Sequence, residues 1–319
     1  MLNYVLRRVP SALAVLAIAS VVIFALLRLV PGDPAESLAG ADATDEAIEV
    51  LRVKLGLTGS PIGQYFSWIG GIVRLDPGQS LIGGGDISEL IADAFGNTLV
   101  LAAAGLMLGV GLALLLSLSS VLLDKAWLNS LVSAFCTLAV AIPNFVVGVV
   151  LVIVFGVVWR ALPAGGTPPA GLWAQPDITA QYLLMPALCL ALPMAAALTR
   201  FLTESIRTQL ELPYVVTARA LGVSRRRIVL QQVLPNALPP AITVLGLQMG
   251  HLLGGAVLVE AIFAWPGLGY LAERSISSRD YPVVQVLLLL SVAVFIVVQV
   301  LTDLVNAWLD PRVRLGGSA

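Results

Sequence analysis

The sequence contains six apolar runs, and each is long enough to cross a lipid bilayer as a helix. The runs cover residues 9–29, 98–123, 128–158, 182–202, 238–260 and 283–309. The hydrocarbon core of a bilayer is spanned by about 20 mainly apolar residues of helix. Because lipid offers no hydrogen-bond partners to the backbone, spans of this length and composition must be helical. We therefore predict an all-α integral membrane protein with six transmembrane helices.

The overall composition excludes a soluble globular domain. Of the 319 residues, 58% are hydrophobic and only 12% are charged, whereas a soluble domain carries about a quarter of its residues as charges. A water-soluble fold would have to expose the surplus as large apolar patches. The net charge is -1 at pH 7, so the charge balance does not indicate a nucleic-acid partner.

The first and third runs each contain a feature that affects how they cross the membrane. Arg7 and Arg8 precede the first run, as in a signal peptide. That run is longer than a signal core, however, and Pro31-Gly32-Asp33-Pro34 lacks the small residues of a cleavage site, so we interpret it as an uncleaved span. The third run contains Pro143, which removes a backbone donor, so this span should tilt or bend there.

The distribution of lysine and arginine predicts that both termini face the cytoplasm. With the N-terminus inside, eleven of the 18 basic residues fall on the inner side: Arg7, Arg8, Lys125, Arg200, Arg207, Arg219, Arg225, Arg226, Arg227, Arg312 and Arg314. The other seven fall on the outer side: Arg28, Arg52, Lys54, Arg74, Arg160, Arg274 and Arg279. The positive-inside rule favours this orientation. An even number of spans also returns the C-terminus to the side of the N-terminus.

The segments between the runs divide the chain into three parts. They are an N-terminal end with the first span at 1–30, an extracytoplasmic segment at 31–97, and a core of five spans at 98–319. Asp45, Glu46 and Glu49 open a pattern that predicts a short amphipathic helix at 44–55. Residues 160–181 are rich in proline and glycine and predict an irregular loop. Residues 203–237 form the long cytoplasmic loop and hold the densest basic cluster.

Motifs of ATP-hydrolysing and proteolytic enzymes are absent from the sequence. It has no G-x-x-x-x-G-K-[ST] phosphate loop, no H-E-x-x-H and no G-x-S-x-G, so we expect no catalytic residue and no ATP hydrolysis by this chain. Cys136 and Cys189 lie in apolar runs and are expected to be buried thiols. Because the only histidine is His251, neither a metal site nor an intramembrane enzyme is expected.

A stand-alone secondary transporter is the alternative from a different class. Carriers driven by ion gradients usually keep carboxylates or histidines at mid-membrane. Here only His251 lies deep in a run, whereas Glu260 and Asp303 lie near the ends of runs. The energy for transport is therefore expected to enter through the cytoplasmic loop.

The cytoplasmic loop has the pattern of a helix, a glycine turn and a second helix. Pro213 suits the first turn of a short helix, and Gly222 suits its left-handed C-terminal cap. Ser224 is expected to cap the second helix, which Pro235 should end or kink. Ala218, Ala220 and Gly222 are small enough for another protein to approach closely. By position alone, a solvated basic loop that obeys the positive-inside rule is the simpler interpretation.

The residues of this loop change that preference, because they resemble the cytoplasmic loop of binding-protein-dependent ABC importer permeases. Ala218, Gly222, Leu234 and Pro235 match the family pattern, whereas Val216, Thr217 and Gln232 depart from its general form. The dipeptide/oligopeptide branch is resembled more closely, through Tyr214, Thr217, Ala218, Arg219, Ala220 and Gly222. The resemblance implies that this loop docks into a groove on an ATPase subunit.

Motifs along nearly the whole chain resemble the same branch, in order and spacing. They are Pro31-Gly32-Asp33-Pro34, Leu55-Gly56-Leu57, Pro61, Gln64-Tyr65, Trp68, Gly78-Gln79-Ser80 (with Leu75 and Pro77 departing), 259–269, Arg279-Asp280-Tyr281-Pro282 and 303–312. The resemblance implies a type I importer permease in the bacterial plasma membrane. Its implied partners are a sister permease, two ATPase subunits that carry ATP and Mg, and an extracytoplasmic binding protein. The implied solutes are di- or oligopeptides, with nickel chelates, glutathione, haem or sugars as alternatives.

The fifth run carries three glycines with a spacing of four residues. Gly246, Gly250 and Gly254 share one helix face, where small residues let two helices touch. Packing within the chain and a face toward the sister permease and the solute path both fit. Gln248 and His251 lie nearby on the same helix. Near the outer end, Glu260 is expected to be an interfacial carboxylate, and Trp265, Pro266 and Gly267 to form a turn at headgroup depth.

The charge count predicts the topology directly. Reporter fusions after Arg314 should give a cytoplasmic signal, and fusions near Gly84 should give an external signal. A reversed pattern would contradict this orientation and the assignment of 203–237 to the cytoplasm.

Overall fold

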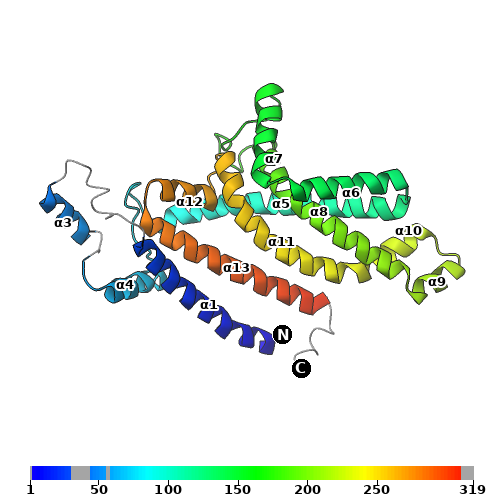
Figure 1. Ribbon diagram of the computed structural model, residues 1–319, viewed down its shortest axis with the longest axis horizontal. Coiled ribbons are helices and arrows are strands. Elements are labelled where there is room, and N and C mark those ends of the chain that lie inside the picture. The colour runs from blue at the N-terminus through cyan, green and yellow to red at the C-terminus, as the bar shows by residue number, and fades with distance from the viewer. Residues whose placement is uncertain (1, 30–43, 55–57, 310–319) are drawn as a thin grey trace. The chain divides into compact units, whose positions relative to one another are not determined.

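The computed structural model describes residues 2–29, 44–54 and 58–309 (Figure 1). The described residues form helices and a single isolated β-bridge between Gln79 and Asp86. In chain order the helices are α1 (Leu2–Arg28), α3 (Asp45–Lys54), α4 (Pro61–Val73), α5 (Ile87–Leu123), α6 (Ala126–Ala141), α7 (Asn144–Leu151), η1 (Val152–Val158), α8 (Pro176–Leu210), α9 (Pro213–Ala220), α10 (Arg225–Arg227), η2 (Ile228–Val233), α11 (Leu234–Ile262), α12 (Leu268–Ser277) and α13 (Tyr281–Leu309). The elements η1 and η2 are π-helical turns.

The predicted helical membrane architecture is confirmed. Among the residues that the structure describes, five helical segments are long and apolar enough to cross a membrane, and α6 with α7 and η1 makes a sixth if this bent pair counts as one span. The pair bends by 102° at the break. Ile142 is extended there and Pro143, which has no N–H to donate, caps α7. The predicted bend at Pro143 is therefore present.

The chain forms two compact units. The first unit consists of residues 1–98 and 266–296, and the second of residues 99–265 and 297–319. Helices α5 and α13 contribute residues to both units.

Helix α8 is the central element of the second unit. Helices α6, α7 and α11 pack against it, and α6 and α11 lie on either side of it in Figure 1. Its buried face carries small side chains at a spacing of four residues, namely Ala187, Ala191 and Ala195. On α5, a Cβ built on Gly105 would lie only 3.2 Å from the Cβ of Leu190. Small residues on both helices thus let the two backbones approach closely, as membrane helices require when lipid gives no hydrophobic drive for association.

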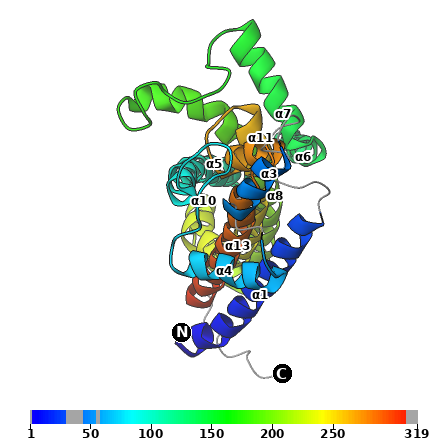
Figure 2. The same ribbon diagram turned by 90° about the vertical axis from the view of Figure 1, so that its left-hand side faces the viewer.

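Contacts between aromatic rings and polar contacts between segments far apart in sequence stabilise the first unit. Helix α4 starts at Ser60, whose hydroxyl accepts from the Gly63 amide, and it crosses α1 (Figure 2). Tyr65 on α4 hydrogen-bonds Ser20 on α1 at 2.8 Å and meets the ring of Phe24 edge-on. These contacts hold α4 against α1. The sequence analysis did not predict α4 as a helix.

A second set of contacts in the first unit holds the loop at 78–87 and helix α12. The buried Asp280 carboxylate accepts from the Ser80 hydroxyl at 2.5 Å and from the Leu81 amide at 3.3 Å. The Thr98 hydroxyl accepts from the Leu268 amide at 2.8 Å and so caps the first turn of α12. These bonds join residues that lie 170 to 200 positions apart in the sequence.

Several helix boundaries differ from the apolar runs that predicted them. Helix α8 ends at Leu210 rather than 202, and α5 begins at Ile87 rather than 98. The extra turns carry polar residues, which a search for apolar runs ends at although the helical hydrogen bonds continue. The short amphipathic helix is confirmed as α3, but Leu55, along with the motif at 55–57, lies outside the described residues, as do 30–43 and 310–319.

The α5–α8 contact generates a test with a matched control on one helix. Gly105→Val should destabilise the folded protein by about 1–3 kcal/mol, because the added methyls overpack the contact with Leu190. Gly111→Val should leave stability nearly unchanged, because a Cβ at Gly111 meets nothing within 4 Å. Thermal unfolding of both variants in detergent would measure the difference. Equal unfolding temperatures would show that α5 does not depend on close approach to α8.

Candidate functional site

The segment between α8 and α10 forms a short, capped helix. Helix α9 begins with Pro213 in its first turn and is ended by Gly222, whose φ is +77°. The Val223 amide donates to the Ala218 carbonyl and the Gly222 amide to the Arg219 carbonyl, at 3.1 and 3.0 Å. This pair of bonds is the Schellman C-cap, which places glycine at the left-handed residue. The predicted helix and its glycine turn are both present.

Helix α9 has one buried and one exposed face. Val215 and Ala218 are buried. The exposed face, which we name the α9 ridge, consists of Val216, Thr217, Arg219, Ala220, Leu221 and Gly222. Val216 and Leu221 are 62% and 78% exposed, so the ridge presents two large apolar side chains beside polar neighbours. A Cβ on Gly222 would meet nothing within 4 Å, so the ridge is open at its glycine.

The position of Ala218 corrects one expectation. The sequence analysis grouped it with Ala220 and Gly222 as small residues that another protein could approach. Ala218 instead faces inward and is 7% exposed, so its small side chain lets α9 pack on its own chain. Ala220 and Gly222 remain on the exposed side.

A hydrophobic cluster of the second unit lies beneath α9 and connects it to three long helices. Its members come from the ends of α5 and α8, from α9, and from η2 and α11: Val121, Leu202, Ile206, Val215, Ala218, Ile228, Val229, Val233, Ala237 and Ala241. Tyr214 packs against this cluster, and its hydroxyl bonds Gln209 of α8 at 3.0 Å. Helix α9 is therefore attached to α8 and α11 by its whole inner face rather than held only by its loop ends.

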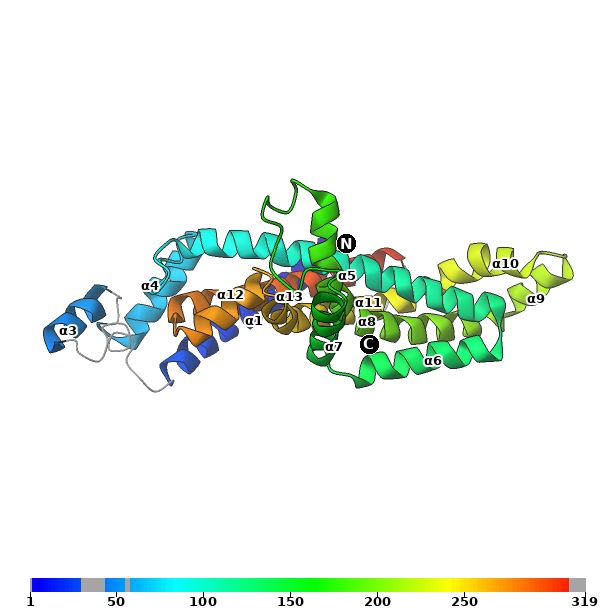
Figure 3. The same ribbon diagram turned by 90° about the horizontal axis from the view of Figure 1, so that it is seen from above.

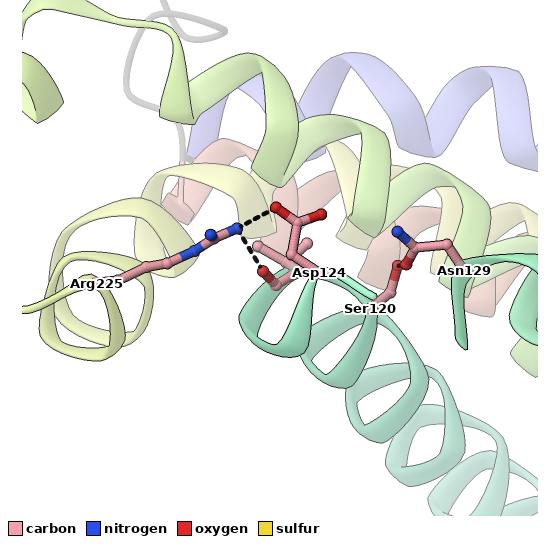
Figure 4. A network of polar contacts seen from close by, with 5 residues as sticks. Ser120, Asp124, Asn129 and Arg225 are labelled. Carbon is pink, nitrogen blue, oxygen red and sulfur yellow. Dashed lines mark hydrogen bonds and ion pairs between the residues drawn. The ribbon is translucent and has the colours of Figure 1, made fainter. Parts of the chain in front are cut away.

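A polar contact, which we name the Arg225 bracket, fixes the other end of this segment (Figure 4). The Arg225 guanidinium donates to the Val121 carbonyl at 2.8 Å and to the Asp124 carboxylate at 2.9 Å. Val121 lies in the last turn of α5, where carbonyls lack partners within the helix and a cation is favourable. Asp124 ends α5 with a φ of 48°, a left-handed conformation that aspartate tolerates. Ser120 bonds Asn129 at 2.6 Å beside it.

Arg225 holds Asp124 in its charged form. The hydrogen bond from Arg225, followed by its charge, lowers the pKa of the Asp124 carboxyl below the ordinary value of 3.8. A group whose pKa is lowered on folding stabilises the fold above its unfolded pKa, and this contribution is lost as pH falls through the lowered value. The Arg225 bracket is thus intact throughout the neutral range.

The second predicted helix begins as expected but does not end at Pro235. Ser224 precedes α10, although its side chain makes no capping bond. The helix continues through η2 into α11, with Pro235 in the first turn of α11 and Leu234 packed against the hydrophobic cluster. Of the two predicted outcomes at Pro235, an end or a kink, the end does not occur. The helix is instead distorted there, because the π-helical turn η2 directly precedes Leu234 and Pro235.

The glycines of the fifth run lie on α11 and differ in their surroundings. Gly246 is buried, Gly250 and Gln248 are half-buried, and Gly254 is exposed, with open space where its Cβ would be. The side chain of His251 lies outside the described residues. The exposed side chains of α11 form a stripe with helical spacing: Pro240, Thr243, Leu247, Gly254, Val257 and Leu258. Packing within this chain therefore accounts for Gly246 but not for Gly254.

The residues after α11 form the predicted turn, but their burial differs from the prediction. Trp265 and Glu260 are both fully buried, and the Trp265 amide donates to the Glu260 carbonyl at 2.9 Å. Trp265 belongs to the hydrophobic core of the second unit, so its ring packs within the chain rather than facing lipid. Pro266 accepts from the Asn97 amide group at 2.9 Å, and Gly267 is the residue before α12.

The cysteines are free and buried, as expected, and Cys189 donates its S–H to the Asn144 carbonyl at 2.9 Å. Among the residues that the structure describes, no group of three or more metal-ligating side chains occurs. The arrangement at α9 offers a surface for contact rather than groups for bond chemistry.

Comparisons with known proteins find matches along nearly the whole chain. The family described as binding-protein-dependent transport system inner membrane component matches residues 105–315, and the N-terminal component of this transport-system membrane family matches residues 1–102. The glutathione transport system permease protein GsiC of Escherichia coli (strain K12) is 35% identical over 98% of this chain and 99% of its own length. The GsiC of Salmonella paratyphi A is 34% identical over the same shares.

Two solved structures have a similar fold. Inward-facing MetNI methionine ABC transporter matches with a TM-score of 0.54 and 21% identity, over 69% of this chain and 96% of that chain. An amino acid ABC transporter with histidines matches with a TM-score of 0.50 and 17% identity, over 70% and 94%.

The Arg225 bracket predicts that neighbouring arginines differ in importance. Arg225→Ala should loosen α9 and speed hydrogen exchange of amides 213–223 several-fold, because both bonds to the end of α5 are lost. Arg226→Ala should leave exchange unchanged, because Arg226 is exposed and makes neither of these bonds. Hydrogen–deuterium exchange of both variants in the same detergent is the measurement. Equal exchange in the two variants would show that the bracket does not hold α9.

Proposed function

The chain belongs to the family of binding-protein-dependent transport system inner membrane components, and from this premise we propose that it imports di- or oligopeptides together with a sister permease. It is an ABC importer permease subunit with the type I permease fold and crosses the inner membrane several times. In the orientation proposed from the charge count, both termini and α9 lie in the cytoplasm. ATP and Mg bind to two partner ATPase subunits and not to this chain.

The α9 ridge is the observation that carries the coupling role. It exposes Val216 and Leu221 beside an open glycine, while the opposite face of the same helix is buried. A partner surface could bury these apolar side chains at a gain of about 25 cal/mol per Å². Tyr214, Thr217, Ala218, Arg219, Ala220, Gly222, Leu234 and Pro235 form this coupling element, with Ala218 and Leu234 on its inner side.

The inner face explains how movement of an ATPase would reach the membrane. Val215 and Ala218 pack in one cluster with Ile206 of α8 and Val233 of η2. Close-packed clusters transmit displacement because they have little free volume to absorb it. A shift of the ATPase groove would therefore move α9 together with the ends of α8 and α11.

The sister permease is proposed to contact the exposed stripe on α11. Gly254, with open space at its Cβ, would allow a helix of the sister subunit to approach closely. Gly250, Gln248 and His251 lie on the same helix and would face this interface or the solute path beside it. The turn at Glu260, Trp265, Pro266 and Gly267 would lie on the outer side, where an external binding protein delivers solute.

Peptides are the favoured solutes, and glutathione is the second candidate. The peptide assignment is supported by the loop and chain motifs of the peptide branch, such as 259–269. Glutathione is supported by the name of the GsiC relatives at 35% identity. Both are small molecules with peptide bonds and carboxylates, so one path could suit either. Nickel chelates, haem and sugars have only the general importer architecture in their favour.

Substitution at the ridge tests the function. Gly222→Val should leave the chain inserted but abolish transport and weaken ATPase retention. The β-branched side chain would cost about 1–2 kcal/mol at a left-handed residue and would project into the partner surface. The measurements are ATPase co-purification and binding-protein-dependent uptake at matched membrane levels. The purified chain alone should show no ATP hydrolysis.

Two control variants separate contact from strain. Gly171→Val introduces the same side chain at another glycine with positive φ (+88°) and open space at its Cβ, so it should retain the ATPase. Arg226→Ala should also transport nearly normally. If Gly222→Val keeps its ATPases and its transport, the loop is a solvated connection and the coupling proposal fails. Uptake by the purified chain without ATPases would instead favour a secondary transporter.

A further inference from the structure

Helix α4 of the first unit carries an exposed apolar face. Ile62, Phe66 and Val73 are 71%, 64% and 77% exposed. Their spacing of four and seven residues places them on one side of the helix, with the half-buried Ile69 between them. We name these four residues the α4 apolar face. Because none of the 13 residues of α4 is charged, no charge on the helix offsets the exposure of this face to water.

A second side of α4 packs against α1 through aromatic side chains. The hydroxyls of Tyr65 and Ser20 are hydrogen-bonded at 2.8 Å. The ring centroids of Tyr65 and Trp68 lie 5.4 and 5.9 Å from that of Phe24. Tyrosine and tryptophan are enriched where membrane spans meet water, because their rings are apolar and their N–H and O–H groups are polar. These contacts hold α4 in one orientation, in which the α4 apolar face is left without a neighbour on α1.

The contacts with α1 place α4 at one end of a membrane span. The span covers Pro10–Arg28, and Arg28 is the first charged residue after Arg8. The Arg28 guanidinium donates to the Gln64 side chain of α4. Ser20 lies eight residues before Arg28, about 12 Å along the helix, which is less than the roughly 15 Å of half a hydrocarbon core. Helix α4 therefore meets α1 within a single leaflet, at the end of α1 away from the N-terminus in Figure 2 and Figure 3.

The length of α4 and its exposure leave few environments that suit it. An apolar helix of 10–14 residues is too short to span a bilayer and is typical of a core helix or an interfacial segment. A core helix is excluded, because none of the residues of α4 is buried. A helix on a water surface would carry charged side chains opposite its apolar stripe, and α4 carries none. The membrane interface is the environment that fits both observations.

A membrane helix of another subunit fits the α4 apolar face less well than lipid does. Helices in membranes associate through small residues that let the backbones approach. The small residues of α4 are Gly63, Ser67 and Gly70, and the helical period places them on a different side from the α4 apolar face. The same part of α1 also exposes large apolar side chains, since Val21 and Leu26 are 52% and 56% exposed. Large flexible side chains around the contact suit fluid acyl chains.

We propose that α4 is an interfacial helix whose apolar face contacts lipid in the leaflet at the Arg28 end of α1. This is the outer leaflet in the orientation proposed from the charge count. Helices of this kind lie in the plane of the interface, with the apolar side about 5–10 Å into the boundary between headgroups and acyl chains. Ser67, on another side of the helix, faces water in this arrangement. The inference depends on α1 being a membrane span and is independent of the solute that the importer carries.

The test measures what surrounds a nitroxide label on each side of α4. Phe66→Cys, Val73→Cys and Ser67→Cys are labelled in the complete importer, copurified with its partner subunits and placed in nanodiscs of phosphatidylethanolamine and phosphatidylglycerol. Power-saturation EPR reports collisions of the label with oxygen, which is concentrated in lipid, and with the polar nickel complex NiEDDA. Labels at 66 and 73 should meet NiEDDA about tenfold less often than the label at 67, because apolar surroundings exclude a polar complex. They should also meet oxygen more often than the label at 67.

Matched measurements separate lipid from the other surroundings. The unaltered importer, whose Cys136 and Cys189 are buried, gives the labelling background. The inference is overturned if labels at 66 and 73 meet NiEDDA as often as the label at 67, because the face is then in water. It is also overturned if those labels are immobilised and meet neither reagent, because a protein segment then covers the face. The two positions share one side of α4, so either variant decides the question if the other fails to assemble.

Discussion

The packing of α8 is the constraint on which the second unit depends. Lipid gives apolar helices no reason to associate, so their contact must come from close packing of complementary surfaces. Ala187, Ala191 and Ala195 provide a flat strip on α8, and Gly105 of α5 fits beside Leu190 on it. The same helix continues into a second cluster through Leu202 and Ile206, where α9 is attached. One helix thus joins the membrane core to the surface that we propose an ATPase contacts.

This arrangement separates positions that hold α9 from positions that a partner can reach. Val215 and Ala218 are buried with the ends of α8 and α11, while Val216 and Leu221 are left exposed on the same two turns. The Arg225 bracket ties the start of the next helix to the last turn of α5. A short helix that is attached on both sides can pass a displacement on to the helices it packs against, whereas a flexible loop would respond by local motion alone.

The lengths of the apolar runs and the positions of turn-forming residues predicted most of the helices, because both depend on interactions between residues close in sequence. Pro213 and Gly222 identify the two ends of α9 from backbone preferences alone, and Pro143 identifies the bend before α7. Burial was less predictable, since Ala218 and Trp265 face inward for reasons set by segments far away in sequence. The contact of Arg225 with Asp124 joins residues 101 positions apart, and no local pattern distinguishes Arg225 from Arg226.

The arginines of the chain show why charge counting gives orientation but not role. Arg200, Arg225 and Arg226 count equally toward the positive-inside rule. In the structure, Arg225 donates to a carbonyl in the last turn of α5, whereas Arg226 is exposed and makes neither bond of the Arg225 bracket. Arg200 is also exposed and donates to the Thr137 hydroxyl of α6. A cation is favourable at a helix C-terminus, where Arg225 meets the Val121 carbonyl and the Asp124 carboxylate. The partner that each arginine meets is set by how α5, α6 and α8 pack, because the charge itself is the same at all three positions.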